Sequence, residues 1–273
     1  MSDDSQAADD AAKVVCEISA GIAQIRFNRP EARNALDPES MQLLTEHLES
    51  TAKNAEVRAV VLTGTGDTFS AGADLKAALS GETGGFAANG PEAMGQLLTQ
   101  IADHPKPTIA RVQGNVYGGG NGLVAACDLS VAADDVRFAF SEVRLGLTPA
   151  VISVVCLPKM RPADAAELFL TGEKVPAQRV AAAGLINKVA AREELDTAVE
   201  AWTEQLRLGG PEALAGTKEL IRRVPTMSRA DGFAYTAELS GGFFRSEEAR
   251  EGMTALFQRR KPTWAESAGA EQE

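Results

Sequence analysis

The chain has 273 residues, which suits one large domain or two small ones, and 44% of them are hydrophobic, so a sizeable core can form. Its 27 basic and 38 acidic residues give a net charge of −11, which counts against a nucleic-acid-binding protein and against docking on an anionic membrane. Residues 1–12 and 265–273 are acidic tails, which we expect to be disordered, and together they carry −7 of this charge. The body between them is therefore nearly neutral and can still bind an anionic ligand.

Histidine and cysteine are too sparse for several kinds of site. The two histidines, His47 and His104, lie far apart in the sequence, so a histidine-rich metal site is not expected. The three cysteines form no CxxC pair, which fits a reducing compartment. The acidic N-terminus does not resemble a signal peptide, and the longest apolar stretch, near residues 145–157, is too short to span a bilayer. We expect a cytoplasmic protein without a bound metal.

Strands and helices are predicted to alternate over the first two thirds of the chain. Residues 21–28 alternate apolar and polar side chains, as in a half-buried strand. A helix is predicted over residues 38–51, where apolar residues recur at helical spacing and Asp37 is placed to cap the first turn. Residues 57–62 form a short apolar run that is typical of a buried strand.

The alternation continues beyond a glycine-rich stretch over residues 80–90, which we expect to be mobile. The elements expected there are a helix over 92–102, strands over 108–112, 129–132 and 136–140, a short helix over 121–127, helices over 162–170 and 176–183, and a strand over 185–189. From about residue 194 onward only helices are expected. This order predicts an α/β core followed by a helical C-terminal region.

Two glycine-bearing turns follow predicted strands. The first is the segment Phe69–Lys76 (FSAGADLK), and the second is Gly114–Gly122 (GNVYGGGNG). Glycine lets the backbone approach a ligand closely, and free N–H groups at a helix N-terminus attract negative charge. Two such turns could aim two N–H groups at one oxygen, which is the geometry of an oxyanion hole. Each turn taken alone is more often only a turn. The second turn also lacks the G-x-G-x-x-G spacing of a dinucleotide site.

The third segment of interest contains a carboxylate, Glu142. Glu142 follows the predicted strand 136–140, and a carboxylate at the end of an apolar strand is partly desolvated, so its pKa can rise toward neutrality. Such a residue can act as a general acid or base. An ion pair with Arg137 or Arg144 is the alternative for this residue taken alone.

Taken together, these segments resemble the enoyl-CoA hydratase/isomerase family, also called the crotonase superfamily. The resemblance runs from about Cys16 to Trp264 and keeps the family's order and spacing of motifs. The motifs that carry it are Asn28-Arg29-Pro30 with Arg33-Asn34-Ala35-Leu36, FSAGADLK, GNVYGGGNG, FAFSEVRLGLTPA, LTGEKVPAQRVAAAGLINKV and SEEAREGMTALFQRRKPTW. As a set they are specific to the superfamily and much less specific to one reaction.

The resemblance implies an α/β fold, namely a crotonase-like spiral of ββα turns over residues 13–195 and a helical C-terminal trimerisation region over 196–264. It implies an acyl-CoA thioester as substrate, with coenzyme A as part of that substrate and no separate cofactor. It also implies a homotrimer or hexamer, while the net charge argues against a nucleic-acid or membrane partner.

The resemblance also implies roles for single residues. The backbone N–H groups of Ala73 and Gly119 would form the oxyanion hole for the thioester enolate, and Glu142 would be the catalytic acid and base. The other substrate- and CoA-binding positions it implies are Arg33, Ala71, Asp74, Leu75, Lys76, Gly118, Gly122, Phe257 and Lys261. Phe257 and Lys261 would reach the substrate of a neighbouring subunit.

One position departs from the best-known hydratases of the family. Those enzymes carry a second glutamate two residues after the GGG run, where this chain has Gly122. We therefore predict an acyl-CoA lyase that adds water to a 2-enoyl-CoA through Glu142 alone. Space above Gly122 is expected to admit a branched or carboxylated acyl group, or a second water. An enoyl-CoA delta-isomerase, which needs one carboxylate, and a non-catalytic acyl-CoA binder are the alternatives.

Overall fold

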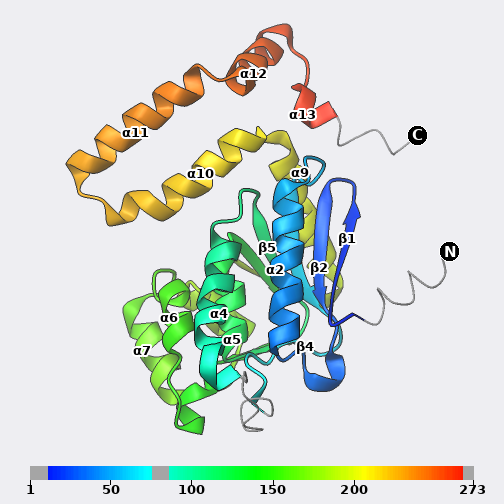
Figure 1. Cartoon of the computed structure of the whole chain (residues 1–273), viewed down its shortest axis with the longest axis vertical. Helices are drawn as coiled ribbons and strands as arrows, with labels where there is room; N and C mark the ends of the chain where they lie inside the picture. Colours follow the sequence, from blue (N-terminus) through cyan, green and yellow to red (C-terminus); the bar gives the residue numbers. More distant parts are fainter. Residues whose placement is uncertain (1–11, 76–85, 267–273) are drawn as a thin grey trace, which may run out of the picture.

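The computed structural model describes residues 12–75 and 86–266, in which two β-sheets are surrounded by helices (Figure 1). The larger sheet has six strands in the order β1-β2-β3-β5-β7-β10. Its strands are β1 (Val14–Ser19), β2 (Ile22–Phe27), β3 (Ala59–Gly64), β5 (Thr108–Val112), β7 (Leu129–Ala133) and β10 (Lys188–Ala190). β1 and β2 form an antiparallel hairpin, and each later strand joins in parallel. Parallel pairing requires crossover segments, which explains the helices between the strands.

The smaller sheet has four strands in the order β4-β6-β8-β9. They are β4 (Thr68–Ser70), β6 (Asn115–Tyr117), β8 (Arg137–Ala139) and β9 (Val175–Pro176). β4, β6 and β8 run parallel to one another, and β9 is antiparallel to β8. The sequence pattern predicts β8 within residues 136–140 but not the other three strands, because two or three residues are too few to show an alternating pattern.

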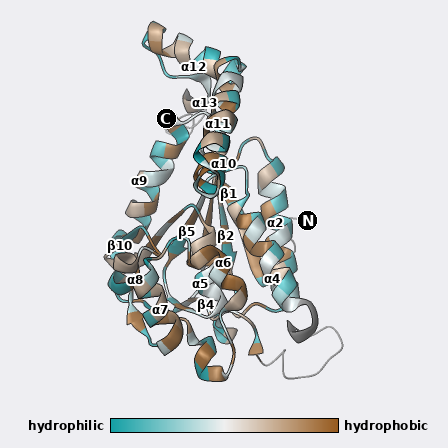
Figure 2. Ribbon diagram, turned by 90° about the vertical axis from the view of Figure 1, so that its left-hand side faces the viewer, coloured by the Kyte–Doolittle hydropathy of each residue, from teal (hydrophilic) through white to brown (hydrophobic). Residues whose placement is uncertain are grey.

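Helices pack on both sides of the larger sheet. Those of the core are α2 (Pro38–Lys53), α4 (Phe86–Ala102), α5 (Gly119–Ala126), α6 (Ala150–Cys156), α7 (Pro162–Thr171) and α8 (Ala177–Ala183). α2 and α4 lie side by side on one face of the sheet, and α9 (Leu195–Leu208) lies on the other (Figures 1 and 2). α5 packs against both α4 and α6, so three helices meet around the glycine run that begins α5.

The prediction of a capped helix after Asp37 is confirmed. The Asp37 carboxylate accepts the N–H of Ser40 at 2.8 Å at the start of α2. The apolar stripe of Met41, Leu44 and Leu48 is buried in the core. The helix is therefore stabilised both by its N-cap and by the burial of its apolar face.

Several predicted boundaries differ from the structure, and three of them have a clear local reason or consequence. The strand expected over 57–62 is β3, which begins two residues later because its pairing with β2 starts at Ala59. The strand expected over 185–189 is β10, since the residues before it are buried in the turn after α8 instead. The helix expected over 92–102 begins earlier, at Phe86, so the last part of the glycine-rich stretch is helical.

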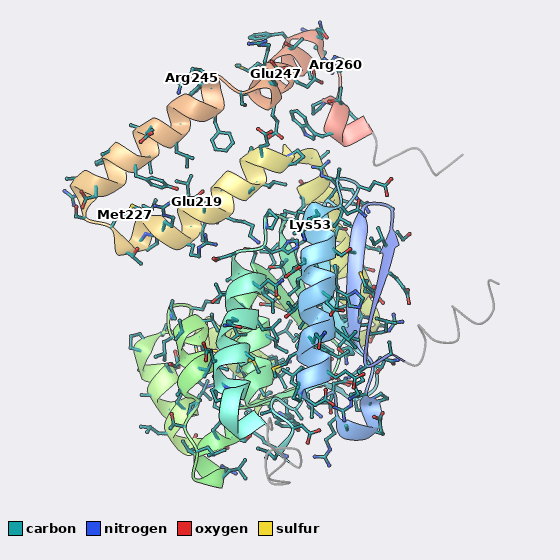
Figure 3. All side chains as sticks on the ribbon, in the orientation of Figure 1. Lys53, Glu219, Met227, Arg245, Glu247 and Arg260 are labelled. Carbon is teal, nitrogen blue, oxygen red and sulfur yellow. The ribbon has the colours of Figure 1, made fainter. Side chains whose placement is uncertain are left out.

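The C-terminal part of the described chain is helical and extends away from the sheets (Figures 1 and 3). After α9 come α10 (Pro211–Arg223), α11 (Arg229–Phe244), α12 (Glu247–Gln258) and α13 (Thr263–Glu266). In Figure 3, Met227 and Arg245 mark the two ends of α11, which lies alongside α10. Within residues 12–75 and 86–266, no helix is both long and apolar enough to cross a membrane.

Candidate functional site

The three segments singled out in the sequence all follow parallel strands of the smaller sheet. The loop that contains Ala73 follows β4, Gly118 follows β6, and Glu142 follows β8. Because parallel strands point the same way, the segments that leave their carboxyl ends meet at one edge of the sheet. The topology therefore brings together residues that are up to seventy positions apart in the chain.

The peptide between Gly72 and Ala73 has a fixed orientation. The C=O of Gly72 accepts the N–H of Leu36 at 2.7 Å, and the N–H of Asp74 donates to the C=O of Leu36 at 3.0 Å. The C=O and N–H of a trans peptide point in opposite directions. The N–H of Ala73 therefore points away from Leu36 and toward the start of α5.

Gly119 begins α5 directly opposite this peptide. A Cβ atom built on Gly119 would lie 3.7 Å from the backbone nitrogen of Ala73, and one built on Gly72 would lie 2.5 Å from the backbone nitrogen of Gly119. The N–H of Gly119 belongs to the first turn of its helix and so has no acceptor within the helix. The structure thus brings the N–H groups of Ala73 and Gly119 into one small region.

Glu142 lies in the short 3-10 helix Ser141–Leu145, just after β8. A Cβ atom on Gly118 would lie 3.4 Å from its Oε1, so the carboxylate stands beside the start of α5. Its Oε2 is buried with no hydrogen-bond partner among the described residues, and burial raises the pKa of this carboxyl above its ordinary value. Arg144 donates instead from Nε to the C=O of Thr171 at 3.1 Å, and no ion pair joins Glu142 to Arg137 or Arg144 among the described residues.

The space beside Gly122 is filled, so the expectation of open space there is wrong. A Cβ atom on Gly122 would lie 2.5 Å from Cγ2 of Ile152 and 3.2 Å from Cδ1 of Leu98. Both side chains are buried. Ile152 belongs to α6 and packs directly on the backbone of α5, which leaves no room for a second water or an acyl branch at Gly122.

Two side chains that the sequence analysis did not select hold the loop after β4 in place. Ser70 donates from Oγ to the C=O of Asn34 at 2.9 Å and accepts the N–H of Gly72 at 3.1 Å. Asn34 donates to the C=O of Thr68 at 2.6 Å and accepts the N–H of Arg29 at 2.8 Å. Asn34 has φ +52°, a left-handed conformation in which asparagine is enriched, and this preference was the available signal.

Asn121 is a third residue that the sequence analysis did not select. Its Nδ2 donates to the C=O of Gly118 at 3.1 Å and to the C=O of Ala139 at 2.9 Å. It therefore ties the start of α5 to the end of β8, the strand that leads to Glu142. An asparagine in the first turn of a helix often bonds to nearby backbone, which could have indicated this role.

Several of the predicted binding positions lie at or near this edge. Ala71 and Leu75 are on the loop after β4, and Arg33 is exposed beside it, with its C=O accepting the N–H of Ala71 at 3.0 Å. Lys76 lies outside the described residues.

Three other predicted positions do not face the site in this chain. The carboxylate of Asp74 lies 3.6 Å from the guanidinium of Arg29, so it is engaged with the protein. Phe257, at the end of α12, and Lys261 lie on the C-terminal helical part, far from the three loops (Figure 1). A role for these two residues therefore requires another copy of the chain.

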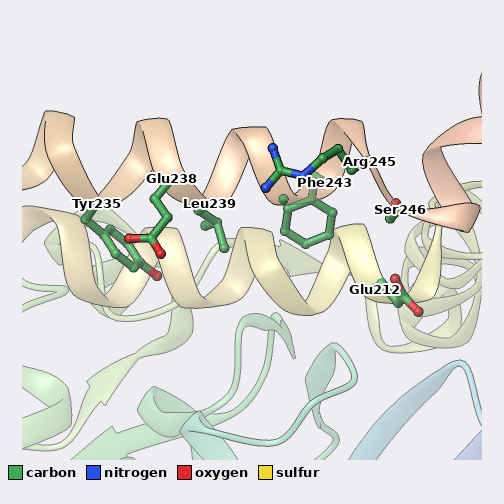
Figure 4. Close-up of a pocket in the computed structure, with 8 residues that line it drawn as sticks. Glu212, Tyr235, Glu238, Leu239, Phe243, Arg245 and Ser246 are labelled. Atoms are coloured by element: carbon green, nitrogen blue, oxygen red, sulfur yellow. The ribbon is translucent and has the colours of Figure 1, made fainter.

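A cavity of about 510 Å³ lies between α10 and α11, lined among others by Tyr235, Leu239 and Phe243 (Figure 4). No residue of the three loops lines it, so it is separate from the candidate site. Among the residues that the structure describes, no group of histidine, cysteine and acidic side chains could hold a metal ion.

Comparisons with known proteins agree with this geometry. The model of the family described as enoyl-CoA hydratase/isomerase matches residues 17–267. A Thermus thermophilus protein provisionally named an enoyl-CoA hydratase is 35% identical over 243 residues, which cover 88% of this chain and 96% of that protein. Carnitinyl-CoA dehydratase of Salmonella paratyphi A is 35% identical over 258 residues, covering 89% of this chain and 94% of that protein. The crystal structure of an enoyl-CoA hydratase from Mycobacterium smegmatis matches with a TM-score of 0.87 at 31% identity, covering 92% of this chain and 98% of that one. The chain belongs to the enoyl-CoA hydratase/isomerase family and has the crotonase fold.

Proposed function

We propose that this protein adds water to the double bond of a 2-enoyl-CoA, with Glu142 as its single acid and base. The observation that carries the proposal is the place of the Glu142 carboxylate, buried and unpartnered at Oε2 and beside the start of α5. The N–H groups of Ala73 and Gly119 meet at the same place. Burial raises the pKa of this carboxyl, so it holds a proton more readily and is better suited to take one from water and return it.

The proposed reaction balances with these groups alone. Glu142 takes one proton from a water molecule while the oxygen of that water bonds to C3 of the enoyl group. The negative charge moves to the thioester oxygen, where the N–H groups of Ala73 and Gly119 stabilise the enolate. Glu142 then gives its proton to C2, which restores the carboxylate. The names of the relatives, an enoyl-CoA hydratase and a carnitinyl-CoA dehydratase, support addition or removal of water as the reaction class.

The test is a panel of straight-chain, branched and carboxylated 2-enoyl-CoAs, together with a 3-enoyl-CoA. Formation of 3-hydroxyacyl-CoA from at least one 2-enoyl substrate is the expected result. Conversion of the 3-enoyl substrate to the 2-enoyl isomer, without hydration, would establish the delta-isomerase instead. Binding of the thioesters without turnover of any would indicate a non-catalytic acyl-CoA binder.

Replacing Gly72 with alanine is expected to lower kcat about a hundredfold, the usual cost of losing one oxyanion donor. Gly72 has φ +77°, and the new Cβ would lie 2.5 Å from the backbone nitrogen of Gly119, so the two N–H groups must move apart. Gly21→Ala is the control, because Gly21 has a similar φ of +76° in the hairpin between β1 and β2, away from the site. Equal kcat in the two variants, measured by hydration of the best substrate, would contradict the role given to this peptide.

We further propose that the C-terminal helices pair with other copies of the chain in a homotrimer or hexamer. Apolar side chains on them stand open to solvent in the single chain: Ile221, Phe233, Phe244, Leu256 and Phe257 are each more than 70% exposed. Patches of this kind mark interfaces. Figure 2 shows these helices extending from the core with hydrophobic residues on them.

Leu256→Glu is expected to reduce the assembly to smaller species, because a carboxylate would have to be buried at the interface. Leu256 is 73% exposed in the single chain, so the change should leave the monomer fold intact. The mass is measured by light scattering after size-exclusion chromatography. Gln258→Glu, which adds the same charge to an exposed position on the same helix, is the control. An unchanged mass for Leu256→Glu would place the interface elsewhere.

A further inference from the structure

Ile152 occupies the place that a side chain on residue 122 would take. Its Cγ2 lies 2.5 Å and its Cβ 3.0 Å from a Cβ atom built on Gly122. Ile152 is only 3% exposed, so its side chain is held in place by its packed neighbours. Gly122 and Ile152 therefore behave as a matched pair in which the small residue on α5 admits the large one on α6.

This pair lies one helical turn beyond the proposed oxyanion donor. Gly119 and Gly122 are three residues apart on α5, so they share a face of the helix and are offset by about 4.5 Å along it. A Cβ atom on Gly119 would meet Cε of Met94 at 3.1 Å, and one on Gly122 would meet Leu98 as well as Ile152. These three buried side chains form an apolar wall along α5. A thioester held at Gly119 would extend its acyl carbons along this wall.

We propose that Ile152 is a specificity-determining residue, which closes the acyl site on the side of Gly122 and excludes 2-enoyl-CoAs with a methyl branch on either carbon of the double bond. The inference rests on the proposed function, because the position of the acyl group follows from the oxyanion donors. The side chains of the wall already lie within 2.5 to 3.2 Å of where a Cβ atom on Gly119 or Gly122 would be, so a methyl branch directed at them finds no space.

The experiment compares kcat/KM for but-2-enoyl-CoA with that for its 2-methyl and 3-methyl derivatives. Wild-type protein is expected to prefer the unbranched substrate, and Ile152→Ala should reduce that preference about tenfold or more for at least one derivative, since one methyl group in an apolar pocket is worth about that factor. Ile152→Val, which removes one methyl group, should reduce the preference for the unbranched substrate by a smaller factor. It provides the test if the alanine variant does not fold. Val154→Ala is the control, because Val154 lies on the same helix and is 74% exposed.

Dissociation constants for butanoyl-CoA and its 2-methyl and 3-methyl derivatives are measured alongside, since these saturated thioesters test the fit without turnover. If the wild-type protein hydrates no 2-enoyl-CoA, the proposed function fails, while a change in the binding preference still supports Ile152. If the wild-type protein hydrates the unbranched substrate but neither preference changes in the Ile152 variants, the proposed function stands and the role of Ile152 is overturned.

Discussion

Glu142→Gln is expected to lower kcat for hydration by a factor of about 10² to 10⁴, which is the usual contribution of a general acid and base. Glutamine keeps the size of the side chain and its position beside Gly118 but cannot take or return a proton. Residue 122 is a glycine, so the second carboxylate of the best-known hydratases is not there to take over the proton transfer. KM should change little, because the thioester is held by the backbone N–H groups of other residues.

The same substitution is expected to stabilise the fold above the ordinary pKa of glutamate. Burial raises the pKa of Glu142 in the folded chain above its unfolded value. The folded state therefore holds this proton to higher pH than the unfolded state does, and the stability from this group falls as pH rises through the raised pKa. Glutamine carries no charge at any pH, so it avoids that loss. Wild-type kcat/KM should fall on the acid side, where Glu142 is protonated and cannot take a proton from water.

Glu200→Gln, on the exposed side of α9, is the control for both measurements. It should leave kcat and the pH dependence of unfolding unchanged. Full activity in Glu142→Gln would remove Glu142 from the mechanism, and lower stability in that variant at neutral pH would contradict its desolvation.

The loops of the candidate site could be predicted from the sequence, since each carries a local signal. Glycine runs indicate close backbone approach, and Glu142 follows an apolar strand. Their meeting point could not be predicted by pattern, because β4 and β6 are three residues long and show no periodicity. The family resemblance supplied that relation instead.

Packing between distant segments could not be predicted from the sequence, and the expected space beside Gly122 is the example. Taken alone, a glycine at residue 122 indicates empty space, because the residue has no side chain. Whether a glycine leaves a cavity depends on what packs against it, and here Ile152 comes from a helix that the sequence analysis did not predict. Close packing of protein interiors makes a filled site the ordinary outcome.

Gly122→Glu is expected to destabilise the fold by about 3 kcal/mol or more, so that little folded protein is recovered. The new Cβ would lie 2.5 Å from Ile152, and overpacking of this kind alone costs about 1–3 kcal/mol. The carboxylate would also be forced among the apolar side chains of Leu98 and Ile152, which adds a desolvation cost. Simply restoring the second glutamate of the best-known hydratases should therefore fail.

The cause can be isolated with alanine and a double-mutant cycle. Gly122→Ala should cost about 1–3 kcal/mol, whereas Gly95→Ala on α4 should be neutral or slightly stabilising, because its new Cβ would meet nothing closer than 3.9 Å. Combining Gly122→Ala with Ile152→Ala should cost less than the sum of the single changes, since each relieves the strain or cavity left by the other. The free energies come from urea unfolding. Additive costs would show that residues 122 and 152 are independent, and the filled space beside Gly122 would not explain the absence of the second glutamate.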